Sequence, residues 1–94
     1  MFVLFFREKA LKEFKGAPRY YQLKINAALD TLCSGNFRQM NIDKLQGTSH
    51  GYRLRVGRWR ILFALNSGER IIEVVSVFLK KGGNDYTKRM PLFR

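Results

Sequence analysis

The fold is decided by one stretch of the chain, Tyr52-Arg53-Leu54-Arg55-Val56-Gly57-Arg58-Trp59-Arg60-Ile61. Its first half alternates strictly between apolar and basic side chains, which is the period of a β-strand with one buried face. Gly57-Arg58 forms a two-residue connection, and glycine at the first loop position is typical of a type II′ turn. An apolar run from Trp59 to Leu65 follows. This stretch therefore predicts a β-hairpin.

The two-residue loop also sets the register of the hairpin. It pairs Val56 with Trp59, Arg55 with Arg60 and Leu54 with Ile61. One face is then apolar and carries Tyr52, Leu54, Val56, Trp59 and Ile61, and the other carries Arg53, Arg55 and Arg60. Like charges directly across a strand pair cost tenths to about 1 kcal/mol. An anion bound between them would reverse the sign of that energy, so the pattern indicates a phosphate site.

The flanking segments complete the fold. Met1 to Phe6 is apolar throughout, which predicts a strand covered on both faces rather than an exposed edge. Glu8 to Lys15 predicts a short amphipathic helix, and a longer helix follows Pro18 and ends near Gly35. Residues 36–51 predict a loop, with a short turn around Ile42 to Leu45. Ile71 to Leu79 is rich in Val and Ile, which predicts a third strand of the meander.

These elements predict a single domain over residues 1–94 of the α+β class. Two N-terminal helices pack on a largely antiparallel four-stranded sheet, in the order strand, helix, helix, strand, strand, strand. The connection around Asn66 to Arg70 leaves one question open. An odd number of connecting residues would place Ser76 opposite Arg60 and put Ser76, Phe78 and Lys80 on the arginine face, whereas an even number would not.

Composition limits the partners. The chain has 18 Lys and Arg against 7 Asp and Glu, a formal net charge of +11, and a surface this basic attracts polyanions: RNA, DNA or an acidic protein. The apolar start of the chain is far shorter than the roughly 20 residues of a membrane span, so we expect a cytoplasmic protein without membrane contact. With only Cys33 and His50 as soft ligands, we expect no disulfide, no metal and no cofactor.

The hairpin, the segment Lys44-Leu45-Gln46-Gly47 before it, and Val75-Ser76-Val77 followed by Lys80 and Tyr86 resemble the RelE/ParE toxin superfamily of bacterial type II toxin–antitoxin systems. The resemblance spans nearly the whole chain and is strongest from Leu45 to Phe63. The run Phe78-Leu79-Lys80-Lys81 is similar to HigB-like and phage-borne branches, so the RelE/HigB-like branch is favoured.

That resemblance implies a ribosome-dependent messenger-RNA endonuclease that needs no metal and is neutralised by a cognate antitoxin. In the family, the mRNA 2′-hydroxyl attacks the adjacent phosphate and leaves a 2′,3′-cyclic phosphate and a 5′-hydroxyl. By resemblance, Arg60 stabilises charge in the transition state, Lys80 protonates the leaving group or contacts phosphate, and Tyr86 stacks on a base and takes part in proton transfer. The phosphate-binding positions implied are Arg53, Arg55 and Lys81.

The sequence departs from the family pattern at the arginines, and it leaves other functions open. RelE has lysines where Arg53 and Arg55 stand, and arginine stays protonated in proteins, so Tyr86 or a neutral lysine is the better proton acceptor. A ParE-like inhibitor of DNA gyrase, which acts by binding, is the first alternative. An inactive relic that binds antitoxin or nucleic acid is the second. Without the resemblance, the arginines would be interpreted as the solvated face of an edge strand.

Overall fold

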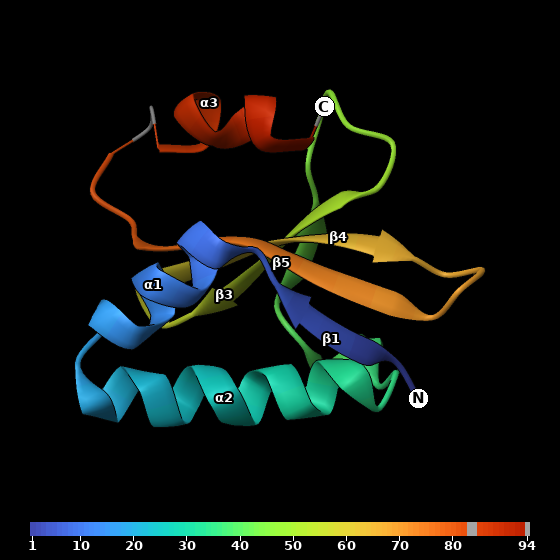
Figure 1. The fold of residues 1–94 in the computed structure, drawn as a ribbon, viewed down its shortest axis with the longest axis horizontal. Helices are drawn as coiled ribbons and strands as arrows, with labels where there is room; N and C mark the ends of the chain where they lie inside the picture. The colour runs from blue at the N-terminus through green and yellow to red at the C-terminus, as the bar shows by residue number, and fades with distance from the viewer. Residues whose placement is uncertain (83–84, 94) are drawn as a thin grey trace.

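A mixed sheet runs through the centre of the molecule, with α2 beneath one face and the C-terminal helices above the other (Figure 1). The computed structural model describes residues 1–82 and 85–93. Within them the elements are β1 (Val3–Phe6), α1 (Glu8–Gly16), α2 (Arg19–Cys33), η1 (Phe37–Gln39), β2 (Ile42–Lys44), β3 (Gly51–Val56), β4 (Trp59–Asn66), β5 (Ile71–Leu79), α3 (Asp85–Arg89) and η2 (Met90–Phe93). The strand order is β1-β5-β4-β3-β2. The predicted α+β class is confirmed, and the predicted elements occur in the predicted order, with η1, β2, α3 and η2 in addition.

The two N-terminal helices form where the apolar spacing predicts them. The acidic Glu8 lies in the first turn of α1 and the basic Lys15 in its last turn, an arrangement that suits the helix dipole. α2 starts directly after Pro18 and buries Ile25, Leu29 and Leu32, which recur at a spacing of four and three residues. That stripe packs against the apolar face of the hairpin and forms the larger of two cores.

The hairpin register agrees with the prediction at every pair, including Arg55 opposite Arg60 and Val56 opposite Trp59. Gly57 has a φ of 60°, and within the described residues Arg58 is not among those with a positive φ. A positive φ at the first loop residue alone belongs to a type II′ turn. The turn chemistry therefore places three arginines on the face away from α2.

The sheet has one strand more than the sequence predicts. β2 lies in the segment interpreted as a loop and pairs antiparallel with β3, with Asp43 opposite Arg53. It has only three residues and lies among Asn, Gly, Thr and Ser, so no period of two is visible in the sequence. Its strand geometry comes from the hydrogen bonds that β3 offers.

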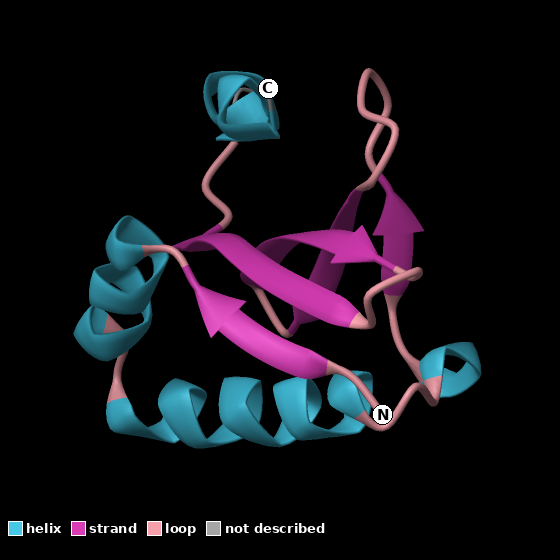
Figure 2. Ribbon diagram, turned by 45° about the vertical axis from the view of Figure 1, so that its right-hand side comes forward, coloured by secondary structure: helices cyan, strands magenta, loops and turns pink. Residues whose placement is uncertain are grey.

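The prediction that the first strand is covered on both faces is wrong. β1 is an edge strand, parallel to β5 (Figure 2), and alternate side chains are open to solvent. Val3 is 58% exposed and Phe5 55% exposed. An uninterrupted apolar run cannot distinguish a buried strand from an edge strand whose outer face is also apolar.

A β-bulge resolves the question of the β4–β5 register. Asn66 pairs with Ile71, so four residues connect the strands, but the register shifts by one between Leu62 and Phe63. Beyond the bulge Phe78, not Ser76, lies opposite Arg60. Both Ser76 and Phe78 nevertheless lie on the arginine face. The even connection alone would have turned these side chains to the opposite face, and the extra residue in β5 turns them back.

The C-terminal residues 85–93, which form α3 and η2 and are called the tail below, fold back over the sheet face that carries the three arginines. They create a second core there. Its buried members are Leu45, Leu62, Val75, Phe78 and Phe93, the last of which comes from η2. Arg7 donates to the carbonyl oxygen of Leu92, and Arg89 donates to the Ser76 hydroxyl at 2.9 Å. The tail is therefore part of the folded structure.

Candidate active site

The folded tail brings Tyr86 onto the arginine face of the hairpin. The Nε of Arg60 donates a hydrogen bond to the Tyr86 hydroxyl oxygen at 3.0 Å. Its Nη1 donates to the carbonyl oxygens of Gly57 at 2.8 Å and Trp59 at 3.0 Å. These bonds hold the Arg60 guanidinium beside the β3–β4 turn. Because the phenol accepts from Arg60, its own proton remains available to a second acceptor.

Two further cations lie against the Tyr86 ring. Cζ of Arg53 is 5.2 Å from the ring centroid and Nζ of Lys80 is 5.4 Å from it. Phe78 contacts the ring edge-on, with centroids 5.8 Å apart. Cations within about 6 Å of an aromatic centroid are attracted by its quadrupole, so the ring draws Arg53 and Lys80 together despite their like charge, while its hydroxyl holds Arg60. We call these three residues and Tyr86 the Tyr86 cluster.

Asp43 supplies the negative charge beside this cluster. Its carboxylate forms a salt bridge with Arg53 and lies 3.8 Å from Nε of Arg55. The hydrogen bond from Arg53 holds the pKa of Asp43 below its ordinary value, and the same bond raises the pKa of Arg53. Among the described side chains, no carboxylate lies within ion-pair distance of Arg60. Sequence reasoning missed Asp43 because it missed β2.

The structure separates the predicted site residues into two groups. It brings Arg53, Arg60, Lys80 and Tyr86 together, with exposed Arg55 joined to them through Asp43. Lys81 is exposed. It lines a hollow with Pro18 and Trp59, and none of Arg53, Arg60, Lys80 and Tyr86 lines that hollow. The roles assigned to all six residues stay predictions.

The position of the tail depends on a polar network below α3. Glu13 of α1 accepts from the Ser76 hydroxyl at 3.1 Å and from the backbone N–H of Val77 at 3.0 Å. Arg89 donates to the Ser76 hydroxyl, lies 3.9 Å from Glu13 and stacks 3.8 Å above the centre of the Phe78 ring. α1, β5 and α3 are therefore joined through one buried serine, and α3 is the helix that carries Tyr86.

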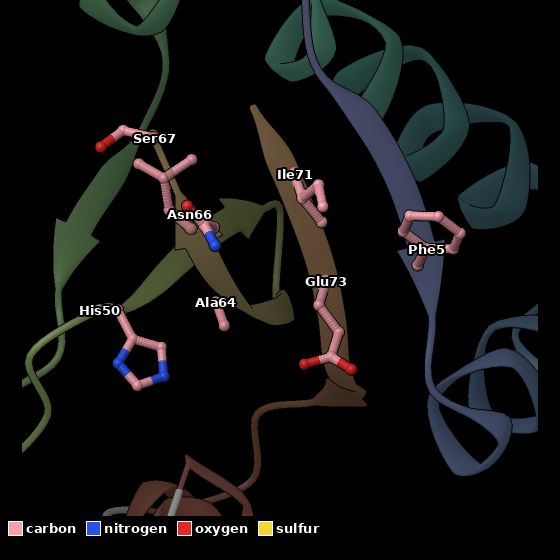
Figure 3. A pocket seen from close by; sticks show the side chains of 8 residues that line it. Phe5, His50, Ala64, Asn66, Ser67, Ile71 and Glu73 are labelled. Carbon is pink, nitrogen blue, oxygen red and sulfur yellow. The ribbon is translucent and has the colours of Figure 1, made fainter. Parts of the chain in front are cut away.

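A second hollow, of about 660 Å³, lies at the other end of the same sheet face, and Figure 3 shows most of its lining. Phe5, Ala64 and Ile71 form its apolar floor, with His50 and Glu73 at its sides. Glu73 is paired with Arg7 at 3.1 Å. No residue of the Tyr86 cluster lines this hollow, so the cationic site is separate from it.

Residues 1–82 and 85–93 hold no group of three or more His, Cys, Asp or Glu side chains that could bind a metal ion. Within the same residues, none of the helices has the length and apolar character needed to cross a membrane.

Comparison with known proteins identifies the family. Residues 4–81 match the family model described as ParE toxin of type II toxin-antitoxin system, parDE. The chain belongs to the RelE/ParE toxin family. The matched range contains Arg53, Arg55, Arg60, Lys80 and Lys81, and it ends before Tyr86. No curated protein matches the sequence.

Solved toxins of this family share the fold. A chain of the archaeal RelE–RelB complex from Pyrococcus horikoshii OT3 has a TM-score of 0.74 at 19% identity, covering 87% of this toxin and 98% of that chain. Isolated Escherichia coli RelE has a TM-score of 0.72 at 21% identity, covering 94% of both chains. A chain of the Methanococcus jannaschii RelB–RelE complex has a TM-score of 0.69 at 25% identity, covering 87% of this toxin and 96% of that chain.

Proposed function

We propose that this toxin is a ribosome-dependent mRNA endonuclease. One observation carries the proposal: the Arg60 guanidinium, with no carboxylate partner among the described residues, donates to the Tyr86 hydroxyl while Arg53 and Lys80 lie against the same ring. A site that concentrates fixed positive charge and a phenol at one place suits a reaction in which negative charge develops on a phosphate.

The proposed reaction is a transesterification within the RNA strand. The 2′-oxygen forms a bond to the adjacent phosphorus, and the bond from phosphorus to the 5′-oxygen breaks. The proton of the 2′-hydroxyl passes to a base, and the departing 5′-oxygen takes a proton from an acid. The products are a 2′,3′-cyclic phosphate and a 5′-hydroxyl, so no water and no redox partner are consumed.

Each residue of the site has a role in this reaction. Arg60 binds the non-bridging oxygens, whose charge rises in the transition state. The Tyr86 hydroxyl, which accepts from Arg60, takes part in proton transfer, and Lys80 protonates the departing 5′-oxygen or contacts the phosphate. Arg53 and Arg55 bind the neighbouring phosphates, with Lys81 further along the strand. Because arginine stays protonated, neither Arg53 nor Arg55 acts as the base.

The family match supports a second candidate function. The matching model describes ParE toxins, and a ParE-like inhibitor of DNA gyrase would act by binding its target rather than by cleaving RNA. Such binding requires no proton transfer, so the Arg60–Tyr86 hydrogen bond would then serve only to hold the tail. This difference makes the two functions separable by experiment.

The partner of the toxin follows the same reasoning. Structural relatives were solved as complexes of RelE with RelB antitoxins. We propose that a cognate antitoxin neutralises this toxin, and that the toxin acts in the cytoplasm where ribosomes translate. Because the toxin is strongly basic, an acidic protein encoded beside it is the expected antitoxin.

The decisive experiment adds the purified toxin to a translating extract and, in parallel, to a gyrase supercoiling assay. We expect mRNA cuts at regular positions within codons, with cyclic phosphate ends, and unchanged supercoiling. The Arg60→Ala variant is the matched control and should give no cuts. Supercoiling inhibition without cuts would establish the ParE-like function. The absence of both effects would establish that the protein is an inactive relic.

A further inference from the structure

We propose that Asp43 occupies the place of an RNA phosphate between Arg53 and Arg55, so that a bound strand displaces this carboxylate. Asp43 is then a resident anion that limits the affinity of the site and gives RNA binding a lower dependence on salt. The inference rests on the proposed function only in taking RNA as the competing anion. It concerns binding and does not require cleavage.

The strand geometry places this carboxylate on the phosphate-binding side chains. Asp43 lies directly opposite Arg53 in the β2–β3 pair, and Arg55 is two residues further along β3 on the same face. One oxygen, Oδ2, contacts Nη2 of Arg53 and lies 3.8 Å from Nε of Arg55. The carboxylate therefore lies between two guanidinium groups that the proposed function assigns to phosphates.

The salt bridge leaves part of Arg53 unsatisfied. Its Nε is buried and has no hydrogen-bond partner among residues 1–82 and 85–93. Arginine presents a planar set of donors that a phosphate, with more oxygens than a carboxylate, can meet at two points. The Asp43 carboxylate meets the guanidinium at Nη2 alone. An anion with more acceptor oxygens fits this site better than its present occupant.

The exchange is physically easy because the pair is open to solvent. The Asp43 and Arg55 side chains are each 45% exposed, and Arg53 is 26% exposed. Ion pairs at this exposure are weak, and salt screens them. RNA phosphates bind with release of condensed counterions, a favourable contribution that the intramolecular carboxylate does not offer. Asp43 therefore holds the arginines in register in the free protein and yields to RNA.

The test measures binding of a short, uncleavable 2′-O-methyl RNA by fluorescence anisotropy over a range of salt concentrations. The Asp43→Asn variant should bind about fivefold more tightly at about 100 mM salt. The slope of log K against log salt should also steepen, because the variant lacks the internal ion pair that salt weakens in the wild type. Asp30→Asn is the matched control, because it removes the same charge from exposed α2. It should leave the slope unchanged, and Asp43→Glu should keep the wild-type slope.

Equal effects of Asp43→Asn and Asp30→Asn would show that only net charge matters and would overturn the proposal. Weaker binding by a folded Asp43→Asn variant would overturn it too. A second measurement needs no variant: carboxyl NMR of the wild type should show the pKa of Asp43 rising when the same RNA is added. An unchanged pKa in the bound state would contradict displacement. Since the RNA is uncleavable, these results stand whether or not the toxin cleaves mRNA.

Discussion

Arg60 is held by three oxygen acceptors, the carbonyls of Gly57 and Trp59 and the hydroxyl of Tyr86. None of these contacts is part of the apolar core, so its removal should leave the fold intact. We expect Arg60→Ala to lower mRNA cleavage about 10²- to 10³-fold, as for the loss of one transition-state donor. Cleavage rates and growth inhibition in expressing cells measure this.

Arg58 provides the control for that change. It follows Gly57 in the same turn and is exposed, and its carbonyl oxygen accepts from the N–H of Lys80 through the backbone alone. Arg58→Ala removes the same charge two residues away and should retain cleavage within about threefold, since the turn conformation and the Arg60 contacts persist. Full toxicity of Arg60→Ala would count against the assigned site.

Two variants separate the proposed role of the Tyr86 ring from that of its hydroxyl. Tyr86→Phe keeps the edge contact with Phe78 and the cation contacts with Arg53 and Lys80, but it removes the acceptor of the Arg60 Nε. We expect cleavage to fall about 10²-fold, as for loss of a proton-transfer group, with RNA binding changed less than about threefold. Tyr86→Ala should weaken binding as well. A Tyr86→Phe variant with wild-type turnover would exclude the phenol from proton transfer.

We expect Asp43 to make the folded state less stable in acid. Its pKa is lower in the folded protein than the ordinary value of about 3.9, so its salt bridges stabilise the folded state above that pH. That stabilisation is lost as the pH falls through the lowered pKa. Denaturant midpoints should therefore fall more steeply below about pH 4 in the wild type than in Asp43→Asn. Parallel midpoints for the two proteins would contradict this prediction.

At the scale of elements, the site depends on the docking of the tail onto the sheet. Phe93 of η2 is 8% exposed and packs with Leu62, Val75 and Phe78. Gly51 allows this close approach, because an added Cβ there would lie 3.0 Å from the Phe93 ring and 2.6 Å from the Thr48 hydroxyl. Tyr86 reaches Arg60 only because η2 and α3 lie against this second core.

Phe93→Ala should therefore undock the tail without unfolding the sheet. Loss of a buried phenylalanine costs about 3 kcal/mol, and here most of that cost falls on the docking step. Amide hydrogen exchange in α3 should accelerate by about 10²-fold, while exchange in β4 changes little. Leu92→Ala, at a half-buried position in the same segment, should have a smaller effect. Equal acceleration in α3 and β4 would show that tail and sheet unfold together.

The elements that could be predicted from the sequence are those whose signal is local. The turn at Gly57, the alternation from Tyr52 to Val56 and the α2 stripe each lie within one segment, so the hairpin register and the arginine face followed from them. β2 depends on pairing with β3, and the bulge after Val74 depends on contacts between strands. The tail docks through side chains far apart in the chain, such as Arg7 and Leu92. Asp43 was missed for the same reason.

At the scale of the whole molecule, part of the basic charge of the chain is gathered at one place. The tail brings Tyr86 to the arginines of the hairpin, beside Lys80, and among the described residues Asp43 is the carboxylate that pairs with Arg53 and Arg55. A basic surface alone would attract any polyanion. What distinguishes a nuclease from a binding protein is whether Arg60 and Tyr86 act on the phosphate that this surface attracts.

Mapping mRNA 5′ ends in cells after induction of the toxin tests that claim most directly. The account predicts new ends at fixed positions within translated codons, with 5′-hydroxyl termini, that disappear with Arg60→Ala. Induced cells that stop growing without new mRNA ends, or with the same ends in the Arg60→Ala variant, would contradict it.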